Sequence, residues 1–195
     1  MLRLGSVRIA KDEGHVSKSG KRVRGEESRA HQFAQSLGLP VPAVHDVTSS
    51  GEETDIVMDF VDGQCLEEAW PSMTPEQKRS IAEQVGAIVT AMRQAVPNQS
   101  TIGAFGGPFH DLRRFASQYG GPFSDEAGFN DFILDFYPGT PPLVRSTISE
   151  AHDVNNRIVF THGDLSPRTS SSRTVACRHC WTGRCRVGCL STGNT

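Results

Sequence analysis

The chain has no long apolar run and almost no cysteine outside its last segment. No stretch among its 195 residues approaches the ~20 apolar residues that a membrane helix needs. The N-terminal segment MLRLGSVRIAKDEG has neither the apolar centre nor the small-residue cleavage site of a signal peptide. Up to Arg168 the only cysteine is Cys65, which argues against a disulfide framework. We therefore expect a cytoplasmic protein without a membrane partner.

Acidic residues are absent from the end of the chain. Residues 169–195 contain four arginines and no Asp or Glu, so they carry a charge of +4, whereas the whole chain carries -2. The preceding residues are therefore acidic overall. For this reason we interpret the basic stretch GKRVRG at residues 20–25 as a solvated charge run and expect no nucleic-acid partner.

Apolar periodicity predicts a small β-rich part that is followed by a mainly helical part. Residues 4–12 alternate around Val7 and Ile9, as a strand does. Residues 43–47 and 54–61 are typical of two strands joined as a hairpin. Apolar residues at helical spacing predict four helices, at residues 26–37, 75–95, 125–136 and 141–152.

The helix expected after residue 74 has the clearest start signals. Thr74 is a suitable N-cap, Pro75 fits the first helical position, and Gln77 completes a capping box. In the next helix we expect Ser124 to be the cap. The apolar faces predicted for these two helices consist of Ile81, Val85, Ile88 and Met92 in the first and of Phe129, Phe132, Ile133 and Phe136 in the second.

The stretch IVFTHGDLSPR at residues 158–168 contains the most informative chemistry. An apolar strand delivers His162 and Asp164 onto a loop, where an Asp can accept a hydroxyl proton or orient a nucleophile. The tripeptide HGD alone is weak evidence, because an Asp in a loop is more often a cap or a turn residue.

In its wider context, THGDLSPR resembles the catalytic loop of the aminoglycoside phosphotransferase and choline kinase-like family, especially its fungal branch. RIAKDEG resembles the family's third strand, EESRAHQFAQSLGLPVPAV the following helix and its PVP segment, and TDIVMDFVDGQCLEEAW the strand and hinge between the lobes. This resemblance covers residues 4–168. It implies an α+β, two-lobed protein-kinase-like fold and an ATP- and Mg²⁺-dependent transfer of a phosphoryl group to the hydroxyl of an unidentified small molecule.

The resemblance also implies roles for individual residues. Asp164 would orient the acceptor hydroxyl and take its proton, while His162 would brace the catalytic loop. Lys11 would face the ATP phosphates and be held by Glu27, with Glu26 competing for that pairing. The residues whose backbone groups would meet adenine are Asp59, Phe60 and Val61.

The domain organisation that follows has three parts. Residues 1–62 would form a β-rich N-terminal lobe with one helix, and residues 63–168 a partial helical C-terminal lobe that ends in the catalytic loop. The family's larger lobe continues beyond that loop, so this lobe would be incomplete. We expect residues 169–195 to be a disordered tail.

The metal ligands of the family are missing from this tail. In the family an Asn follows the catalytic Asp by five positions, and an Asp stands at the end of the next strand. Thr169 occupies the Asn position, and no Asp or Glu follows Leu165. Mg²⁺ prefers oxygen ligands of this kind, so we expect that the metal site is lost, that no residue of the tail binds a metal for catalysis, and that the truncated chain is inactive.

Read one base out of phase after Arg168, the tail encodes the missing residues. Trp181 has the single codon TGG and the codons of Thr182 begin with AC, so the shifted codon is GAC, which encodes Asp. With permitted synonymous codons the whole tail back-translates to NILVEDGRVSALLDWEMSGWLPEYWEY, which continues the family's catalytic loop. We therefore interpret residues 169–195 as an out-of-frame segment.

Two other functions remain open. One is a non-catalytic pseudokinase that binds nucleotide through Lys11 and the hinge without a metal. The other is a zinc-binding interaction module, because the tail has four cysteines at C-x2-C-x4-C-x3-C spacing. Its ligands would be Cys177, Cys180, Cys185 and Cys189, with His179 as a substitute.

Overall fold

The computed structural model divides the chain into two compact units. The first consists of Met1–Arg93 with His162–Cys185, and the second of Gln94–Thr161 with Arg186–Thr195. The residues that the structure describes are 2–4, 7–21, 23–95, 101–109, 119–135, 139–152, 154, 156–163, 165, 171–172, 177–179 and 186–187.

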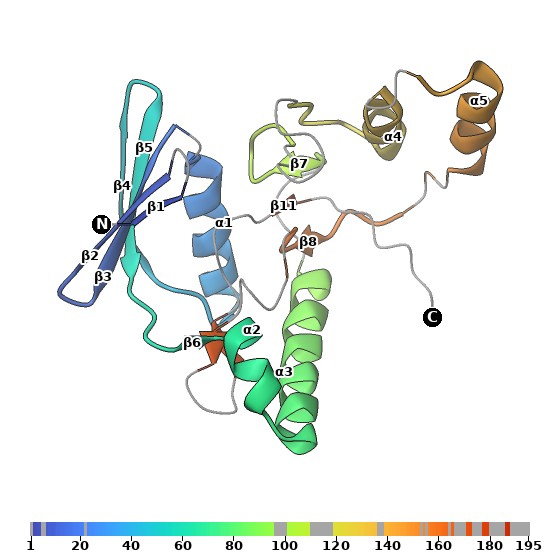
Figure 1. Cartoon of the computed structure of the whole chain (residues 1–195). Coiled ribbons are helices and arrows are strands. Elements are labelled where there is room, and N and C mark those ends of the chain that lie inside the picture. The colour runs from blue at the N-terminus through green and yellow to red at the C-terminus, as the bar shows by residue number, and fades with distance from the viewer. Residues whose placement is uncertain are drawn as a thin grey trace. The chain divides into compact units, whose positions relative to one another are not determined.

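An antiparallel five-stranded sheet with the order β1-β2-β3-β5-β4 dominates the first unit (Figure 1). Its strands are β1 (Leu2–Leu4), β2 (Val7–Asp12), β3 (His15–Gly20), β4 (Val44–Ser50) and β5 (Glu53–Asp59). The predicted hairpin is confirmed as β4 and β5, which pair antiparallel. A second hairpin joins β2 to β3, and its two turn residues, Glu13 and Gly14, have φ angles of 29° and 88°. Positive φ at both positions is what a tight two-residue hairpin requires.

One helix, α1 (Gly25–Ser36), lies beside this sheet in Figure 1. Ala30 and Ala34 on the helix are fully buried, so their small side chains allow a close approach. On the sheet, Ile56 and Met58 form a core with Val23, against which Val16, Val44 and Val47 pack. The face of the sheet that carries Ile56 and Met58 is called the inner face below.

The strand β3 is absent from the elements predicted by apolar periodicity. Val16 is the only large apolar residue in HVSKSG, so the segment has too little hydrophobic alternation to predict a strand. It forms one because it is the central strand, bonded to β2 on one side and to β5 on the other. Tertiary pairing, and not the side-chain pattern, determines its conformation.

Further along the first unit, helix α2 (Leu66–Ala69) and a short 3₁₀ turn, η1 (Trp70–Ser72), precede α3 (Pro75–Gln94). The predicted capping box is confirmed. The Thr74 amide donates to Gln77 Oε1 at 2.9 Å, and the Gln77 amide donates to Thr74 Oγ1 at 3.3 Å. Ile81 and Met92 of the predicted stripe are buried, whereas Val85 and Ile88 are half-buried.

The second unit contains β7 (Gly103–Ala104), α4 (Glu126–Asp135), α5 (Pro142–Ala151), β8 (Phe160–Thr161) and β11 (Arg186–Val187). Ile102, Phe109 and Phe129 form its core, and Phe123, Phe132, Ile133 and Ile158 pack against them. The cap of α4 differs from the prediction, because the Gly128 amide donates to Asp125 Oδ1 at 2.8 Å. Asp125, not Ser124, therefore caps this helix. Phe136 lies outside the described residues.

Short strands occur within the segment that the sequence predicts to be a disordered tail. In the first unit, β9 (Ser171–Ser172) pairs with β6 (Gln64–Cys65) and with β10 (Cys177–His179). In the second unit, β11 lies between β7 and β8. For the rest of residues 169–195, disorder stays a prediction.

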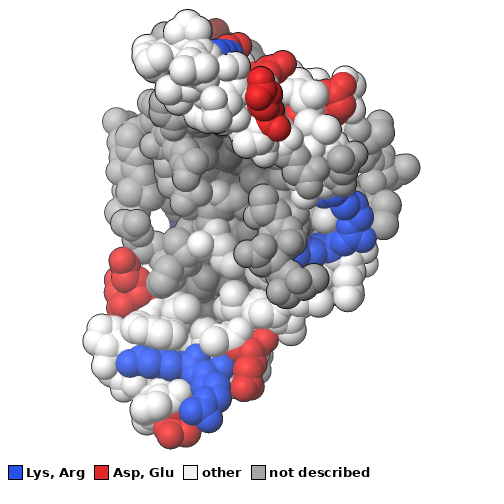
Figure 2. Space-filling view, turned by 90° about the vertical axis from the view of Figure 1, so that its right-hand side faces the viewer, with Lys and Arg blue, Asp and Glu red and all other residues white. Residues whose placement is uncertain are grey.

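The described surface combines charged and apolar features. On the face in Figure 2, the Lys and Arg side chains of the described residues form separate small groups, and the group at the bottom of the view lies beside Asp and Glu side chains. Helix α5 exposes the apolar side chains of Leu143, Val144 and Ile148. No helix within the described ranges has the length and apolar character needed to cross a membrane.

Candidate functional site

A partly buried ion pair joins the central strand of the sheet to helix α1. Lys18 lies opposite Ile9 on β2 and Ile56 on β5, and directly opposed residues of antiparallel strands share one face. The Lys18 ammonium therefore lies on the inner face, where its Nζ is 2.5 Å from Glu27 Oε1. The side chains of Lys18 and Glu27 are only 21% and 8% exposed, so this pair is shielded from bulk water.

Lys11 occupies a different place on the same face. It lies opposite Val16, one alternate position along β3 from Lys18, which corresponds to about 7 Å along the strand. Its Nζ lies 3.5 Å from the centroid of the Phe60 ring, a cation–π contact. Glu26, the other predicted partner, pairs with Arg29 at 3.4 Å.

The structure pairs Glu27 with Lys18, whereas the sequence predicts that Glu27 pairs with Lys11. The segment RIAKDEG forms β2 and the following turn, and the third strand begins at His15. Lys18 was missed because β3 itself was missed. The signal that could have revealed Lys18 is the strand-like triplet V-x-K at residues 16–18. Its lysine lies nine positions before Glu27, at the start of a predicted helix.

The predicted adenine segment follows directly from β5. The Asp59 amide donates to the Ala43 carbonyl at 2.9 Å, and the Phe60 amide donates to the Gly14 carbonyl at 2.8 Å. Val61 is the third residue of the segment, and no acceptor for its amide occurs among the described residues. Among these three consecutive residues, Val61 is the one whose backbone amide has no acceptor within the part of the chain that the structure describes.

The side chain of Asp59 is held at two points. Its Oδ2 accepts from the Ala43 amide at 3.1 Å, and its Oδ1 lies 2.6 Å from His45 Nε2. The hydrogen bond with His45 is the main reason why the pKa of Asp59 lies below its usual value. This carboxylate lies on the outer face of the sheet, because its neighbour Met58 lies on the inner face.

The residues of the predicted catalytic loop follow β8. Phe160 is fully buried and His162 is 4% exposed, whereas Asp164 lies outside the described residues. Within the first unit, His162 acts electrostatically on His31 of α1. His162 is therefore an internal residue near the helix that carries Glu27, which is compatible with a bracing role.

His31 is a buried histidine that no pattern in the sequence predicts. Its side chain is 1% exposed. Burial is the main cause that lowers the pKa of His31 from 6.5 to about 4, and the positive charge of Lys18 acts in the same direction. The nearby backbone carbonyl of Pro42 acts in the opposite direction and raises this pKa. At neutral pH the imidazole of His31 is thus uncharged. It therefore adds no positive charge close to the Lys18–Glu27 pair.

In the second unit, a buried carboxylate fixes the segment that enters β8. Glu126 is 6% exposed, and its two carboxylate oxygens accept from the Asn156 amide and from Asn156 Nδ2, both at 2.9 Å. These bonds connect the start of α4 to the residues immediately before Ile158. They position the strand from which the catalytic loop leaves.

We expect Glu126→Ala to lower the free energy of unfolding by about 3 kcal/mol, because it leaves two donors of Asn156 unsatisfied. Urea denaturation followed by circular dichroism measures this loss. Glu150→Ala is the matched control, since Glu150 is an exposed acid on α5. Equal losses in the two variants would show that the contacts with Asn156 contribute nothing.

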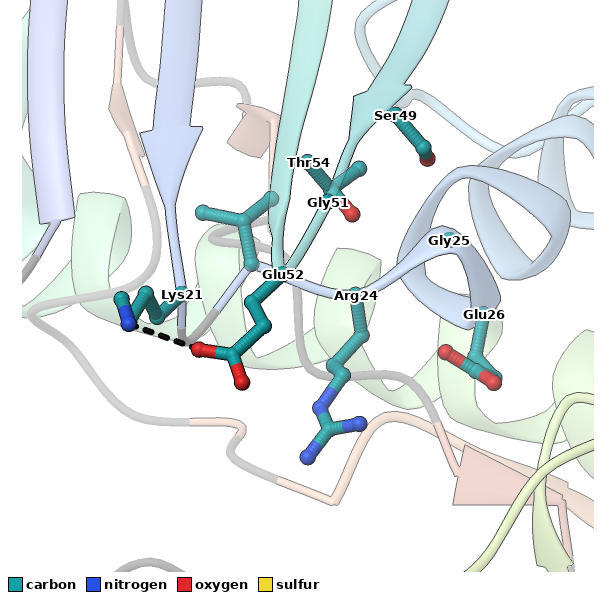
Figure 3. Close-up of a pocket in the computed structure, with 9 residues that line it drawn as sticks. Lys21, Arg24, Gly25, Glu26, Ser49, Gly51, Glu52 and Thr54 are labelled. Atoms are coloured by element: carbon teal, nitrogen blue, oxygen red, sulfur yellow. Dashed lines mark hydrogen bonds and ion pairs between the residues drawn. The ribbon is translucent and has the colours of Figure 1, made fainter.

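A pocket of about 430 Å³ lies elsewhere in the first unit, between the start of α1 and the β4–β5 turn (Figure 3). Its charged lining residues are Lys21, Arg24, Glu26 and Glu52, and Lys21 pairs with Glu52 at 2.6 Å. Two cations and two anions give no net attraction for a phosphate. Thr54, which lines the pocket, is five positions from Asp59 on β5, or about 17 Å along the strand. The pocket therefore lies away from the predicted adenine segment.

Comparison with known proteins identifies one family. Residues 17–168 match the profile of a family described as phosphotransferase enzymes. The match includes Lys18, Glu27 and the catalytic loop, but it begins after Lys11. No curated protein sequence matches the chain.

Several solved structures share the fold. A thermostable variant of aminoglycoside phosphotransferase APH(4)-Ia with ADP and hygromycin B matches with a TM-score of 0.59 at 12% identity, over 93% of this chain and 68% of that one. A complex of APH(2")-IIa with streptomycin and ATP matches with a TM-score of 0.57 at 13% identity, over 94% and 67%. The predicted α+β, protein-kinase-like fold is thereby confirmed.

Proposed function

Because the chain belongs to the phosphotransferase enzyme family, we propose that its first unit binds a nucleoside triphosphate and that Lys18, held by Glu27, contacts the phosphates. The partly buried ion pair between β3 and α1 carries this proposal. In protein kinases a lysine of the third strand contacts the phosphates and pairs with a glutamate of the following helix. Lys18 and Glu27 occupy these elements in this chain.

Lys11 then has a different task from the one the sequence predicts. Its ammonium lies against the ring of Phe60, the second residue of the adenine segment. We propose that this contact fixes the Phe60 side chain. The amide of Val61 is the donor that remains for the adenine edge, because those of Asp59 and Phe60 are bonded to Ala43 and Gly14.

The family reaction transfers the γ-phosphoryl group of the nucleotide to the hydroxyl of a small molecule. We propose that Asp164 would orient this hydroxyl and accept its proton, and that buried His162 would brace the loop. The two structural neighbours contain hygromycin B and streptomycin. They support an acceptor with hydroxyl groups, and THGDLSPR at residues 161–168 supports a place in the fungal branch of the family.

Magnesium does not fit the residues present after the catalytic loop. Thr169 stands where the family has Asn, and residues 165–195 contain no carboxylate. Mg²⁺ binds through carboxylate and other oxygen ligands, and those the family uses are missing. We therefore propose that the chain as printed does not catalyse transfer and that its tail is out of frame after Arg168. The family match ends at the same residue.

A second candidate function is nucleotide binding without catalysis. The Lys18–Glu27 pair favours it, because this pair needs no residue of the tail. The zinc module of the four cysteines has less support. Cys177 and His179 belong to β10, but Cys180, Cys185 and Cys189 lie outside the described residues.

A comparison of Lys18→Met with Lys11→Met tests the proposal. We expect Lys18→Met to weaken ATP binding at least about tenfold, because charge-assisted hydrogen bonds to phosphate are lost. Lys11→Met should change it by no more than about twofold, since a cation–π contact at an exposed site contributes little. Titration of a fluorescent ATP analogue in magnesium-free buffer measures both affinities.

Adenosine, which has no phosphates, is the internal control for folding. Its affinity should be the same in the parent chain and in Lys18→Met. Equal losses of ATP affinity in the two lysine variants would contradict the assignment of Lys18. Absence of ATP binding in the parent chain would overturn the nucleotide-binding proposal itself.

A further inference from the structure

Two histidines and one carboxylate meet on the outer face of the sheet, away from the Lys18–Glu27 pair. His15, His45 and Asp59 each present one possible ligand atom, and these atoms all lie within 4.8 Å of one another. The two imidazole rings are 4.7 Å apart in an edge-on arrangement. His45 and Asp59 remain 43% and 48% exposed, so an ion can reach them from solvent.

The strand register explains why these residues meet. His15 begins β3 and lies directly opposite Asp59, the last residue of β5. On the other side of β5, the pairing shifts between Val44 and Asp46, so that His45 is the extra residue of a β-bulge. A bulge redirects a side chain relative to regular alternation. Val44 is opposite inner-face Met58, and the bulge places His45 on the outer face beside Asp59.

The carboxylate is already oriented for a ligand. Asp59 Oδ2 accepts from the Ala43 amide, which leaves Oδ1 directed at His45 Nε2. Hydrogen bonds of this kind to the second oxygen are typical of carboxylates that bind metals. Asp12 lies opposite His15 on β2, and its negative charge on the same face adds to the attraction for a cation.

We propose that His15, His45 and Asp59 form a binding site for a divalent transition metal, with Zn²⁺ as its ion. Two imidazoles and one carboxylate are a known zinc ligand set, with metal–ligand distances of about 2.0–2.2 Å and a fourth position open to water. Such distances place tetrahedral ligand atoms about 3.3 Å apart. The 2.6 Å distance between His45 Nε2 and Asp59 Oδ1 must widen slightly. The distances from the ligand atom of His15 to the other two ligand atoms must shorten by side-chain rotation.

A bound ion would connect three strands at one end of the sheet. β3, β4 and β5 each contribute one ligand, and Asp59 is the residue from which the chain leaves the sheet toward Phe60. Zinc would therefore stabilise the first unit and fix this exit point. The inference does not depend on nucleotide binding, because it uses side chains on the outer face, whereas the proposed nucleotide contacts come from Lys18 and from the backbone amide of Val61.

Titration of the full chain with Zn²⁺ at pH 7.5, after removal of any histidine tag, tests the site by calorimetry. We expect one zinc ion per chain and a rise of a few degrees in the thermal midpoint. His15→Gln, His45→Gln and Asp59→Asn should each weaken binding at least about tenfold and abolish this rise. Asp46→Asn is the matched control, because Asp46 follows His45 in the bulge but lies outside the ligand set.

Co²⁺ as a second probe separates this site from the cysteines of the tail. Cobalt held by two imidazoles and a carboxylate has no thiolate charge-transfer band, whereas cobalt on cysteines has a strong one. Retention of full affinity in all three ligand variants, or a thiolate band at one equivalent, would overturn the proposal. So would the absence of zinc binding at 100-fold excess of metal over chain.

Discussion

Restoring the shifted reading frame after Arg168 should convert an inactive chain into a working phosphotransferase. We expect turnover to rise by at least about 10³-fold, because a single missing group for transition-state charge costs about 10²–10³ in rate and the printed tail lacks two. In the shifted frame Asn stands at position 169 and Asp at position 182, so both oxygen ligands return. The neighbours of Lys18 and Glu27 need not change.

The measurement should not depend on knowing the acceptor. Hydrolysis of ATP in the presence of Mg²⁺, in which water accepts the phosphoryl group, detects transfer without a specific alcohol. A panel of hydroxyl compounds then identifies the acceptor. Two proteins are compared: the printed chain and the product of the frame-restored coding sequence. Turnover by the printed chain would contradict its predicted inactivity.

A matched variant connects the restored activity to the catalytic loop. Asp164→Asn in the frame-restored protein should remove the turnover while leaving ATP affinity within about twofold, because Asp164 is assigned to proton transfer and not to phosphate binding. If the frame-restored protein folds and binds ATP but transfers nothing, the frame interpretation is wrong. Genomic codons after Arg168 that cannot encode Asn and Asp in the shifted phase would lead to the same conclusion.

Features that depend on neighbouring residues in the sequence were predictable. The capping box of Thr74 and Gln77 requires only residues three positions apart, and the structure has both of its hydrogen bonds. The β4–β5 hairpin follows from two apolar runs separated by turn residues. In each case the partner lies within a few positions, so a local pattern contains the whole interaction.

Features that depend on distant pairing were not predictable from periodicity. The strand that carries Lys18 has one large apolar side chain and forms because β2 and β5 pair with both of its edges. Without that strand, Lys11 was the only lysine of the region in an apolar context. The family resemblance assigned the phosphate-contacting lysine to β2, whereas the lysine that contacts Glu27 in the structure lies on β3.

The His15, His45 and Asp59 cluster shows the same limit more sharply. The three residues span 45 positions of the chain, and their meeting depends on a one-residue shift in the β4–β5 register. No spacing in the sequence corresponds to a bulge of this kind. The tail cysteines, by contrast, have a conspicuous spacing but belong to a segment that the family match does not include.

The second large effect expected of this chain is acid destabilisation through His31. This imidazole is 1% exposed, and burial, reinforced by the charge of Lys18, lowers its pKa from 6.5 to about 4. Between these two values the unfolded chain binds a proton at this residue and the folded chain does not. The free energy of unfolding is therefore unaffected by His31 above pH 7 and falls as the pH decreases from about 6.5 to 4.

The size of the effect follows from the shift in pKa. Each unit corresponds to about 1.4 kcal/mol, so the loss attributable to His31 should reach about 3 kcal/mol near pH 4. A loss of this size is a large part of the stability of an ordinary domain. Urea midpoints measured from pH 7.5 to pH 4, with EDTA present to exclude metal, provide the profile.

Replacement of the titrating group isolates its contribution. His31→Gln keeps a polar side chain at this position but cannot gain a proton, so its stability should depend less on pH by the same ~3 kcal/mol. The carboxylates of the chain, including Asp59, titrate equally in both proteins and cancel in the difference. His152→Gln, which removes a histidine from the second unit, should retain the full acid sensitivity. Parallel profiles for the parent chain and His31→Gln would show that His31 accepts its proton as readily in the folded state as in the unfolded one, and that its burial is not maintained in solution.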